Sequence, residues 1–176
     1  MTEKTKKVLL WILDIGLNLG IIFALVFVIQ KWIIAPFDVS GSSMCDTLNN
    51  IKGECHNGYG EKIIINEALY ELNDPERGDI VVFLAPHQSN DEEEKYFIKR
   101  VIVIPEDKIK IKNGKVSVKP KDAEAAIEIN EPNLNEQNNN NTQAYFSNFS
   151  VFEVPKGKYF LMGDNRQAST DSRSCF

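Results

Sequence analysis

A long apolar segment near the N-terminus constrains the fold of this 176-residue chain more than any other feature. Residues 8–34 are mostly aliphatic or aromatic, and a helix of about 20 apolar residues crosses the hydrocarbon core of a bilayer. Asp14, Asn18, Gln30 and Lys31 interrupt the segment. We expect Asp14 to lie among the headgroups on one side and Lys31 on the other, where its long side chain reaches water. The segment therefore predicts a transmembrane helix.

A cleavable signal peptide is the alternative interpretation of this segment. Such a peptide has a shorter apolar region, of about 7–15 residues, followed by small residues at the cleavage site. The stretch Gln30–Pro36 is a poor cleavage site, which favours a retained anchor. Three of the first seven residues are lysines, so the positive-inside rule places the N-terminus in the cytoplasm. We expect a cytoplasmic basic tail at residues 1–7, the anchor at 8–34 and an extracytoplasmic domain at 35–176.

The charge and the cysteines exclude several classes of partner. The formal net charge is −5 and the basic residues are scattered beyond the N-terminus, which argues against binding of nucleic acid. Cys45 and Cys55 are close in sequence and could form a disulfide outside the cytoplasm, with Cys175 left over. With His56 they could instead bind a metal, but their spacing matches no usual zinc pattern. We expect neither a metal nor a cofactor.

Beyond the anchor, the chain has the pattern of short β-strands. Residues 108–112 and 115–119 alternate between lysine or serine and aliphatic side chains around Asn113-Gly114, the strongest short-range hairpin signal. Apolar runs bounded by turn residues predict four more strands, at 62–66, 77–84, 95–104 and 158–162. We expect a mainly β fold: an N-terminal transmembrane helix followed by an extracytoplasmic domain built as an antiparallel β-sheet or barrel.

Residues 121–150 interrupt the strand pattern. This stretch contains Glu136–Thr142, in which four asparagines follow one another. Such a polar tract lacks the apolar side chains that bury a core. The sequence predicts an exposed, flexible insertion in the β domain.

Ser43 and Lys99 are the residues with candidate chemistry. A serine with a lysine as its base can hydrolyse amide bonds without a histidine or a metal. A free lysine has a pKa of about 10.4, so it must be desolvated before it can accept a proton at neutral pH. On a strand, Lys99 shares its face with Phe97 and Val101, which would supply that desolvation. Taken alone, each residue is better explained as an ordinary turn serine or as a lysine with a buried stem and a solvated head.

Four phrases, in order along the chain, resemble the sequence boxes of the type I signal peptidases. These are membrane-anchored Ser/Lys proteases that remove signal peptides. The phrase Gly41-Ser42-Ser43-Met44-x-x-Thr47-Leu48 resembles the nucleophile box, and Tyr96–Ile102 resembles the base box. Residues 77–83 are similar to the second box and residues 154–173 to the last. The resemblance covers nearly the whole chain.

The resemblance implies a role for each matching residue. It makes Ser43 the nucleophile and Lys99 its general base, and it matches Ser169 to a serine that hydrogen-bonds and orients the lysine. Asp171 and Arg173 match a charged pair that holds this region in place. Five apolar residues match positions that line shallow pockets for small substrate side chains, namely Phe37, Val39, Met44, Phe97 and Ile98.

The resemblance also implies an activity. It predicts a serine endopeptidase that removes signal peptides from exported preproteins after small residues at the membrane surface. Its partners would be those signal peptides and membrane lipid, with the secretion machinery as a further candidate. At about 3.3–3.6 Å per residue, the roughly eight residues between the apolar segment and Ser43 span no more than some 30 Å. A signal peptide is cut just beyond its own apolar stretch, so the serine and the scissile bond would lie at a similar depth.

Two alternatives and three departures accompany this interpretation. One alternative is an inactive membrane-anchored β domain that binds exported peptides by strand addition. The other is a protease that uses Cys45 with His56, which a Cys45–Cys55 disulfide would exclude. The departures are Asp46 in place of the family's usual proline, Glu106 in place of a turn glycine, and further family strands beyond the position of Phe176, without which a sheet edge would be open.

Overall fold

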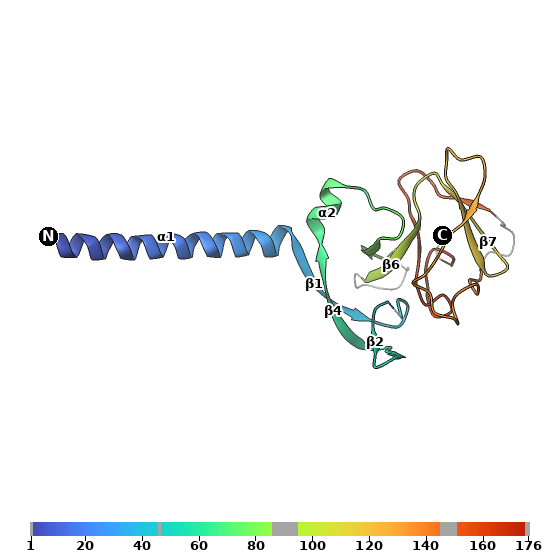
Figure 1. The fold of residues 1–176 in the computed structure, drawn as a ribbon, viewed down its shortest axis with the longest axis horizontal. Helices are drawn as coiled ribbons and strands as arrows, with labels where there is room; N and C mark the ends of the chain where they lie inside the picture. The colour runs from blue at the N-terminus through green and yellow to red at the C-terminus, as the bar shows by residue number, and fades with distance from the viewer. Residues whose placement is uncertain (1, 46, 86–94, 145–150, 175–176) are drawn as a thin grey trace. The chain divides into compact units, whose positions relative to one another are not determined.

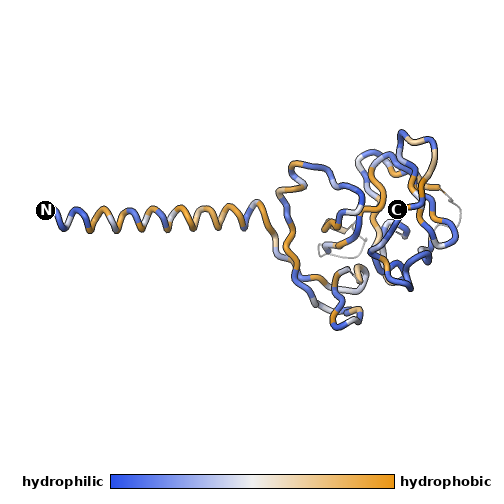
Figure 2. Tube along the Cα trace, in the orientation of Figure 1, coloured by the Kyte–Doolittle hydropathy of each residue, from blue (hydrophilic) through white to orange (hydrophobic). Residues whose placement is uncertain are grey.

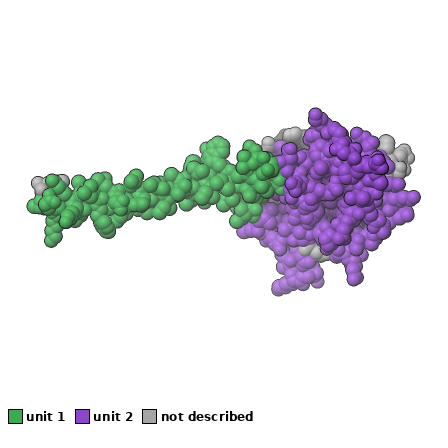
Figure 3. Space-filling model, turned by 45° about the horizontal axis from the view of Figure 1, so that its top comes forward, with its two compact units in different colours: residues 1–37, 64–73 green, residues 38–63, 74–176 purple. Residues whose placement is uncertain are grey.

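The computed structural model describes the chain except for residues 1, 46, 86–94, 145–150 and 175–176. The departures at Asp46 and Phe176 and the third cysteine, Cys175, therefore lie outside the described residues. The chain divides into two compact units, which Figure 3 shows in green and purple.

The first unit, residues 1–37 and 64–73, is dominated by helix α1, Glu3–Trp32. Thr2 caps the start of the helix with its side-chain hydroxyl. Among the described residues, α1 is the one helix long and apolar enough to cross a membrane, and Figure 2 shows apolar residues along it. It includes most of the predicted basic tail and ends two residues before the predicted limit, because Ile34 already begins a strand.

The second unit, residues 38–63 and 74–176, is mainly β. It contains a three-stranded sheet of order β11-β6-β5, a four-stranded sheet of order β10-β7-β8-β9 and the small β2-β3 pair, while β1 pairs with β4 (Figure 1). The pairings within the second unit are antiparallel. The elements that follow α1 have these bounds: β1 (Ile34–Ser40), β2 (Asn50–Ile51), β3 (Glu54–Cys55), β4 (Tyr59–Asn66), α2 (Glu67–Leu72), β5 (Ile80–Leu84), β6 (Tyr96–Val103), β7 (Lys108–Lys112), β8 (Lys115–Lys119), β9 (Ile127–Glu128), β10 (Phe152–Glu153) and β11 (Phe160–Met162).

The predicted fold class is confirmed, and the β7-β8 hairpin has the predicted bounds. Its turn residues Asn113 and Gly114 have φ values of 52° and 79°, the left-handed conformation that a tight hairpin turn requires. Lys112 pairs directly with Lys115 across this turn. The turn chemistry therefore fixes the register, as the sequence predicted.

The hydrophobic core of the second unit contains residues of both larger sheets. Strands β6 and β11 supply one part and strands β7 and β8 the other, so the core joins the two sheets. Its buried members are Ile102, Val103, Ile109, Val116, Val118, Val154, Phe160 and Met162.

Most of residues 121–144 are exposed, but a few of them pack against the β domain. The flexibility expected of this insertion stays a prediction. Leu134, Asn138 and Thr142 are only 9%, 3% and 2% exposed. The N–H of Thr142 donates to the carbonyl of Gly114 at 3.0 Å. The polar side chains of this tract find partners within the protein, and composition alone does not report such partners. The rest of the predicted insertion, residues 145–150, lies outside the described residues.

Candidate active site

Ser43 is half-buried in a tight turn that follows strand β1. The N–H of Cys45 donates to the carbonyl of Ser42 at 3.1 Å, and the N–H of Leu48 donates to that of Met44 at 2.9 Å. Met44 and Cys45 are each 1% exposed, so one side of the turn is packed inside the protein. Ser43 is therefore carried on a backbone whose conformation is well determined.

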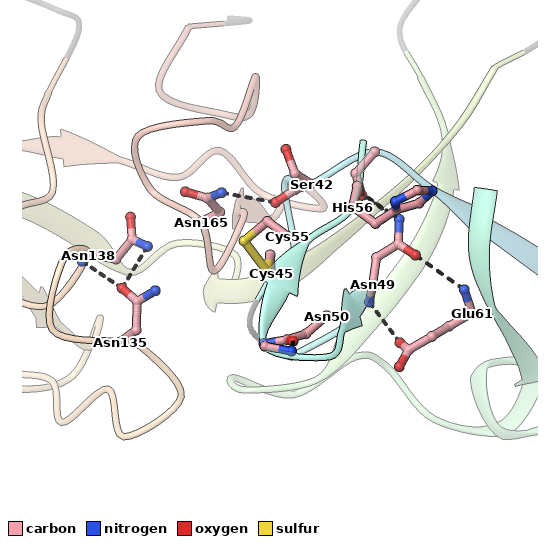
Figure 4. Close-up of a disulfide and its surroundings, with 12 residues drawn as sticks. Ser42, Cys45, Asn49, Asn50, Cys55, His56, Glu61, Asn135, Asn138 and Asn165 are labelled. Carbon is pink, nitrogen blue, oxygen red and sulfur yellow. Dashed lines mark hydrogen bonds between the residues drawn. A yellow bond between two sulfur atoms is a disulfide. The ribbon is translucent and has the colours of Figure 1, made fainter. Parts of the chain in front are cut away.

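Asn49 ties this turn to the following chain (Figure 4). It is completely buried, and its Nδ2 donates to the carbonyls of Gly41, His56 and Gly58 at 3.0, 3.0 and 2.9 Å. Its backbone N–H donates to Glu61 Oε2 at 2.7 Å. Loss of this amide would leave buried carbonyls unpaired, which is costly. No motif pointed to Asn49, because its side-chain partners are backbone groups.

A disulfide joins Cys45 in the Ser43 turn to Cys55 at the end of β3 (Figure 4). This pairing answers the question that the sequence left open, and it excludes Cys45 as a nucleophile in this structure. Within the described ranges, no group of three His, Cys, Asp or Glu residues is placed to hold a metal ion.

The loop 163–166 holds the Ser43 turn from the other side. The N–H of Asn165 donates to the carbonyl of Ser43 at 3.0 Å, and its Nδ2 donates to that of Ser42 at 3.1 Å (Figure 4). A methyl group added at Gly163 would lie 2.4 Å from the Ser43 carbonyl oxygen, so a larger residue there would displace the turn. These contacts join residues from opposite ends of the second unit.

Strand β6 places Lys99 beside Ser43. The distance between Lys99 Nζ and Ser43 Oγ is 2.8 Å, and Nζ also donates to the carbonyl of Ile98 at 2.9 Å. Lys99 is 4% exposed and its Nζ lies 5.3 Å from the ring centre of Phe97. Burial lowers the pKa of Lys99 below its ordinary value, and the opposing effect of the Asp171 charge is smaller.

Asp171 and Arg173 form a buried ion pair in the last box. Arg173 Nε donates to Asp171 Oδ1 at 2.8 Å and Nη2 donates to Oδ2 at 2.7 Å. Burial raises the pKa of Asp171, but the bonds and charge of Arg173 and the N–H of Gly163 outweigh burial and lower it overall. Asp171 is therefore a carboxylate near neutral pH, and it also holds the backbone of Gly163.

Ser169 lies beside this pair but is not bonded to Lys99. Its Oγ is buried and forms no hydrogen bond of ordinary geometry with a described residue, but its interaction with the Asp171 carboxylate helps to lower the pKa of Asp171. A methyl group at Gly163 would lie 2.3 Å from this oxygen, so Ser169 packs directly against the loop that supports Ser43. The hydrogen bond to Lys99 that the resemblance implies is not formed in this structure, and the orienting role of Ser169 stays a prediction.

The five predicted pocket residues have different surroundings. Val39 and Met44 are 4% and 1% exposed, so both side chains are part of the protein interior. Phe97 and Ile98 are half-buried on β6, next to Lys99. Phe37 is half-buried and belongs to the first unit. Phe97 and Ile98 thus have the accessibility that contact with a substrate requires. Val39 and Met44 could affect a bound substrate only through the residues that cover them.

The geometry of Ser43 and Lys99 defines a class of chemistry. An amine at hydrogen-bond distance with a lowered pKa can take the proton of a serine hydroxyl, which activates the oxygen as a nucleophile. An arrangement of this kind can support hydrolysis by a serine nucleophile with a lysine base.

Comparison with known proteins identifies the family. The family model described as signal peptidase, peptidase S26, matches residues 12–176. Signal peptidase IB of Staphylococcus aureus strain COL is 32% identical over 180 residues, which cover 96% of this chain and 81% of that protein. Signal peptidase I P of Bacillus subtilis subsp. natto is 34% identical over 175 residues, covering 98% and 83%. A crystal structure of a signal peptidase I from Enterococcus faecalis V583 is 24% identical, covers 57% of this chain and 86% of its own, and gives a TM-score of 0.38.

The chain belongs to the signal peptidase family, peptidase S26, and is a serine endopeptidase.

Proposed function

We propose that this peptidase removes N-terminal signal peptides from exported preproteins, with Ser43 as the nucleophile and Lys99 as the general base. The single observation that carries the mechanism is the 2.8 Å distance between Ser43 Oγ and the buried Nζ of Lys99. The relatives that support the substrate are signal peptidases, and cleavage after small residues is the specificity expected from the family resemblance.

The reaction follows from the positions of these atoms. Neutral Lys99 takes the proton of Ser43 as Oγ attacks the scissile carbonyl carbon, and the oxyanion accepts a hydrogen bond from the Ser43 N–H. The protonated Lys99 then donates to the leaving amine, and an acyl-enzyme forms. Water that is deprotonated by Lys99 attacks the ester and releases Ser43.

The other site residues support this pair in the proposal. Asp171 and Arg173 hold the loop 163–166, and Ser169 orients Lys99 through the hydrogen bond that the family resemblance implies. Phe97 and Ile98 contact the substrate, and Phe37, Val39 and Met44 stay pocket candidates on the resemblance alone.

The proposed location is the outer surface of a membrane. Residues 8–34 span the bilayer, the basic residues 1–7 lie in the cytoplasm, and residues 35–176 form the extracytoplasmic peptidase domain. The length and apolar composition of α1 and the lysines that precede its apolar part support this topology. The anchor keeps the peptidase in contact with membrane lipid and near signal peptides delivered through the same membrane. The machinery that exports preproteins is a further candidate partner.

A preprotein cleavage assay in detergent tests the mechanism. We expect the wild type to cut a preprotein and the Ser43→Ala and Lys99→Met variants to be inactive. Cleavage that survives either substitution would contradict the Ser/Lys mechanism. A folded wild type that binds preproteins but never cuts them would favour the alternative, an inactive β domain that binds peptides by strand addition.

A further inference from the structure

Arg166 carries a buried charge whose counter-ion lies outside the four sequence boxes. The Arg166 side chain is 0% exposed and that of Glu131 is 12% exposed. Arg166 Nη1 donates to Glu131 Oε2 at 3.1 Å and to Thr142 Oγ1 at 2.7 Å, and Nη2 donates to Glu131 Oε1. A guanidinium at this depth needs a carboxylate, because an unpaired buried charge is costly.

The same guanidinium contacts the loop that supports Ser43. Arg166 Nε donates to the carbonyl of Gly163 at 3.0 Å, and the N–H of Asn165 in that loop donates to the carbonyl of Ser43 at 3.0 Å. A continuous path therefore runs from Glu131 to Arg166 by hydrogen bonds, along the loop 163–166, and to the Ser43 turn by the Asn165 hydrogen bond.

Neutral side chains of the tract 121–144 hold it against this loop. Asn133 Nδ2 donates to Asp164 Oδ1 at 2.8 Å, and the N–H of Gln167 donates to Asn138 Oδ1 at 3.3 Å. Asn138 is itself bonded to Asn135 at 3.0 Å (Figure 4). Glu131 therefore has a fixed position relative to Arg166.

We infer that Glu131 is a positioning residue for Ser43, acting through Arg166 and the loop 163–166. This inference rests on the proposed function, because the role of Ser43 is itself proposed. Without the Glu131 carboxylate, Arg166 loses the partner that aims Nε at Gly163. The loop then loosens, and Ser43 Oγ leaves its short contact with Lys99. In this proposal neither Glu131 nor Arg166 contacts the bound peptide, so the chemical step slows while substrate binding does not.

Steady-state cleavage by the full chain in detergent tests the inference. For Glu131→Ala we expect kcat to fall roughly 10- to 100-fold. KM should stay within about twofold, because no substrate contact is removed. Glu131→Gln keeps one acceptor oxygen and should recover part of the loss. Glu128 is the matched control, since it lies on β9 and pairs with Lys115 at 2.7 Å where both side chains are about half exposed, 53% and 48%. Equal kcat values for Glu131→Ala and Glu128→Ala would overturn the inference.

A double variant separates positioning from folding. Glu131→Met with Arg166→Met replaces the buried pair by apolar side chains, a change that proteins often tolerate without loss of stability. We expect this folded variant to remain slow, because methionine cannot donate to the Gly163 carbonyl. A wild-type kcat in the folded double variant would overturn the positioning role.

Amide hydrogen exchange of residues 163–167 provides a readout that does not depend on activity. Exchange should be faster in Glu131→Ala than in Glu128→Ala. If exchange speeds up but the wild type cuts no preprotein, the proposed function fails and the link from Glu131 to the loop stands. If the wild type cuts preprotein and neither kcat nor exchange differs between the two variants, the link fails and the proposed function stands.

Discussion

Lys99 and Arg173 are both buried basic residues of the second unit, yet their hydrogen-bond partners differ. Arg173, 1% exposed, donates to both oxygens of the Asp171 carboxylate. Lys99, 4% exposed, bonds to the neutral oxygens of Ser43 and Ile98, and no described carboxylate forms an ion pair with it. Depth of burial is therefore similar, but the partners differ. Burial lowers the pKa of Lys99, whereas the Arg173 guanidinium is compensated by a carboxylate.

The largest effect is expected when Lys99 is made a permanent cation. In Lys99→Arg the guanidinium keeps its proton at any assay pH, so it cannot act as a base. We expect preprotein cleavage to fall about 10³-fold or more. The free energy of unfolding should also fall, because the new charge has no carboxylate partner.

Lys99→Met is the control for this substitution. It should be as inactive as Lys99→Arg in the cleavage assay but clearly more stable in urea unfolding. Similar stability of the two variants would show that the surroundings of Lys99 accept a charge, which would remove the contrast with Arg173.

The second-largest effect, on the free energy of unfolding, is expected when Asp171 loses its ion-pair partner Arg173. Arg173→Met leaves a carboxylate buried without its partner, which costs about 3–5 kcal/mol of unfolding free energy. Adding Asp171→Asn removes that charge and should recover part of the loss. Chemical denaturation measures both values. A double variant no more stable than Arg173→Met would mean that packing, and not the unpaired charge, causes the loss.

A smaller, pH-dependent effect should distinguish wild type from Lys99→Met. Because burial lowers the pKa of Lys99, the unfolded chain binds more protons than the folded chain between the folded-state pKa and the ordinary value of 10.5. Wild-type stability should therefore rise with pH across that window. Lys99→Met lacks the titrating amine, so its stability advantage should be greatest below the folded-state pKa and vanish above pH 10.5. A difference that is constant from neutral pH to pH 10.5 would contradict a lowered pKa.

The smallest effect is expected at an ion pair on the surface. Lys62 pairs with Asp38, and their side chains are 81% and 52% exposed. Water already solvates both charges, so Lys62→Ala should change the free energy of unfolding by no more than about 0.5 kcal/mol. Thermal or urea unfolding measures this change. A loss comparable to that of Arg173→Met would show that burial does not determine how much an ion pair contributes to stability.

The features predicted from the sequence are those encoded in contiguous residues. Asn113-Gly114 fixes the β7-β8 hairpin because its turn conformation depends on these two residues and their neighbours. The phrases around Ser43 and Lys99 could be found because each is short and unbroken. The two side chains then meet in the fold at 2.8 Å.

The features that were missed depend on partners that no short motif contains. Asn49 bonds to the backbone carbonyls of Gly41, His56 and Gly58, and Glu131 pairs with an arginine 35 residues further along. Composition could not show that individual residues of a polar tract would find such partners. Strands β2, β3, β9 and β10 have two residues each, too few to show an alternating pattern.

The bond from Asn165 to the carbonyl of Ser42 spans 123 positions of the chain. A ribosome makes about 5–20 residues per second, so roughly 6–25 s separate the synthesis of these two residues. During that interval the anchor and Ser43 already exist, while the loop that completes the turn does not. The order of synthesis thus delays the assembly of the site until the last part of the domain has been made.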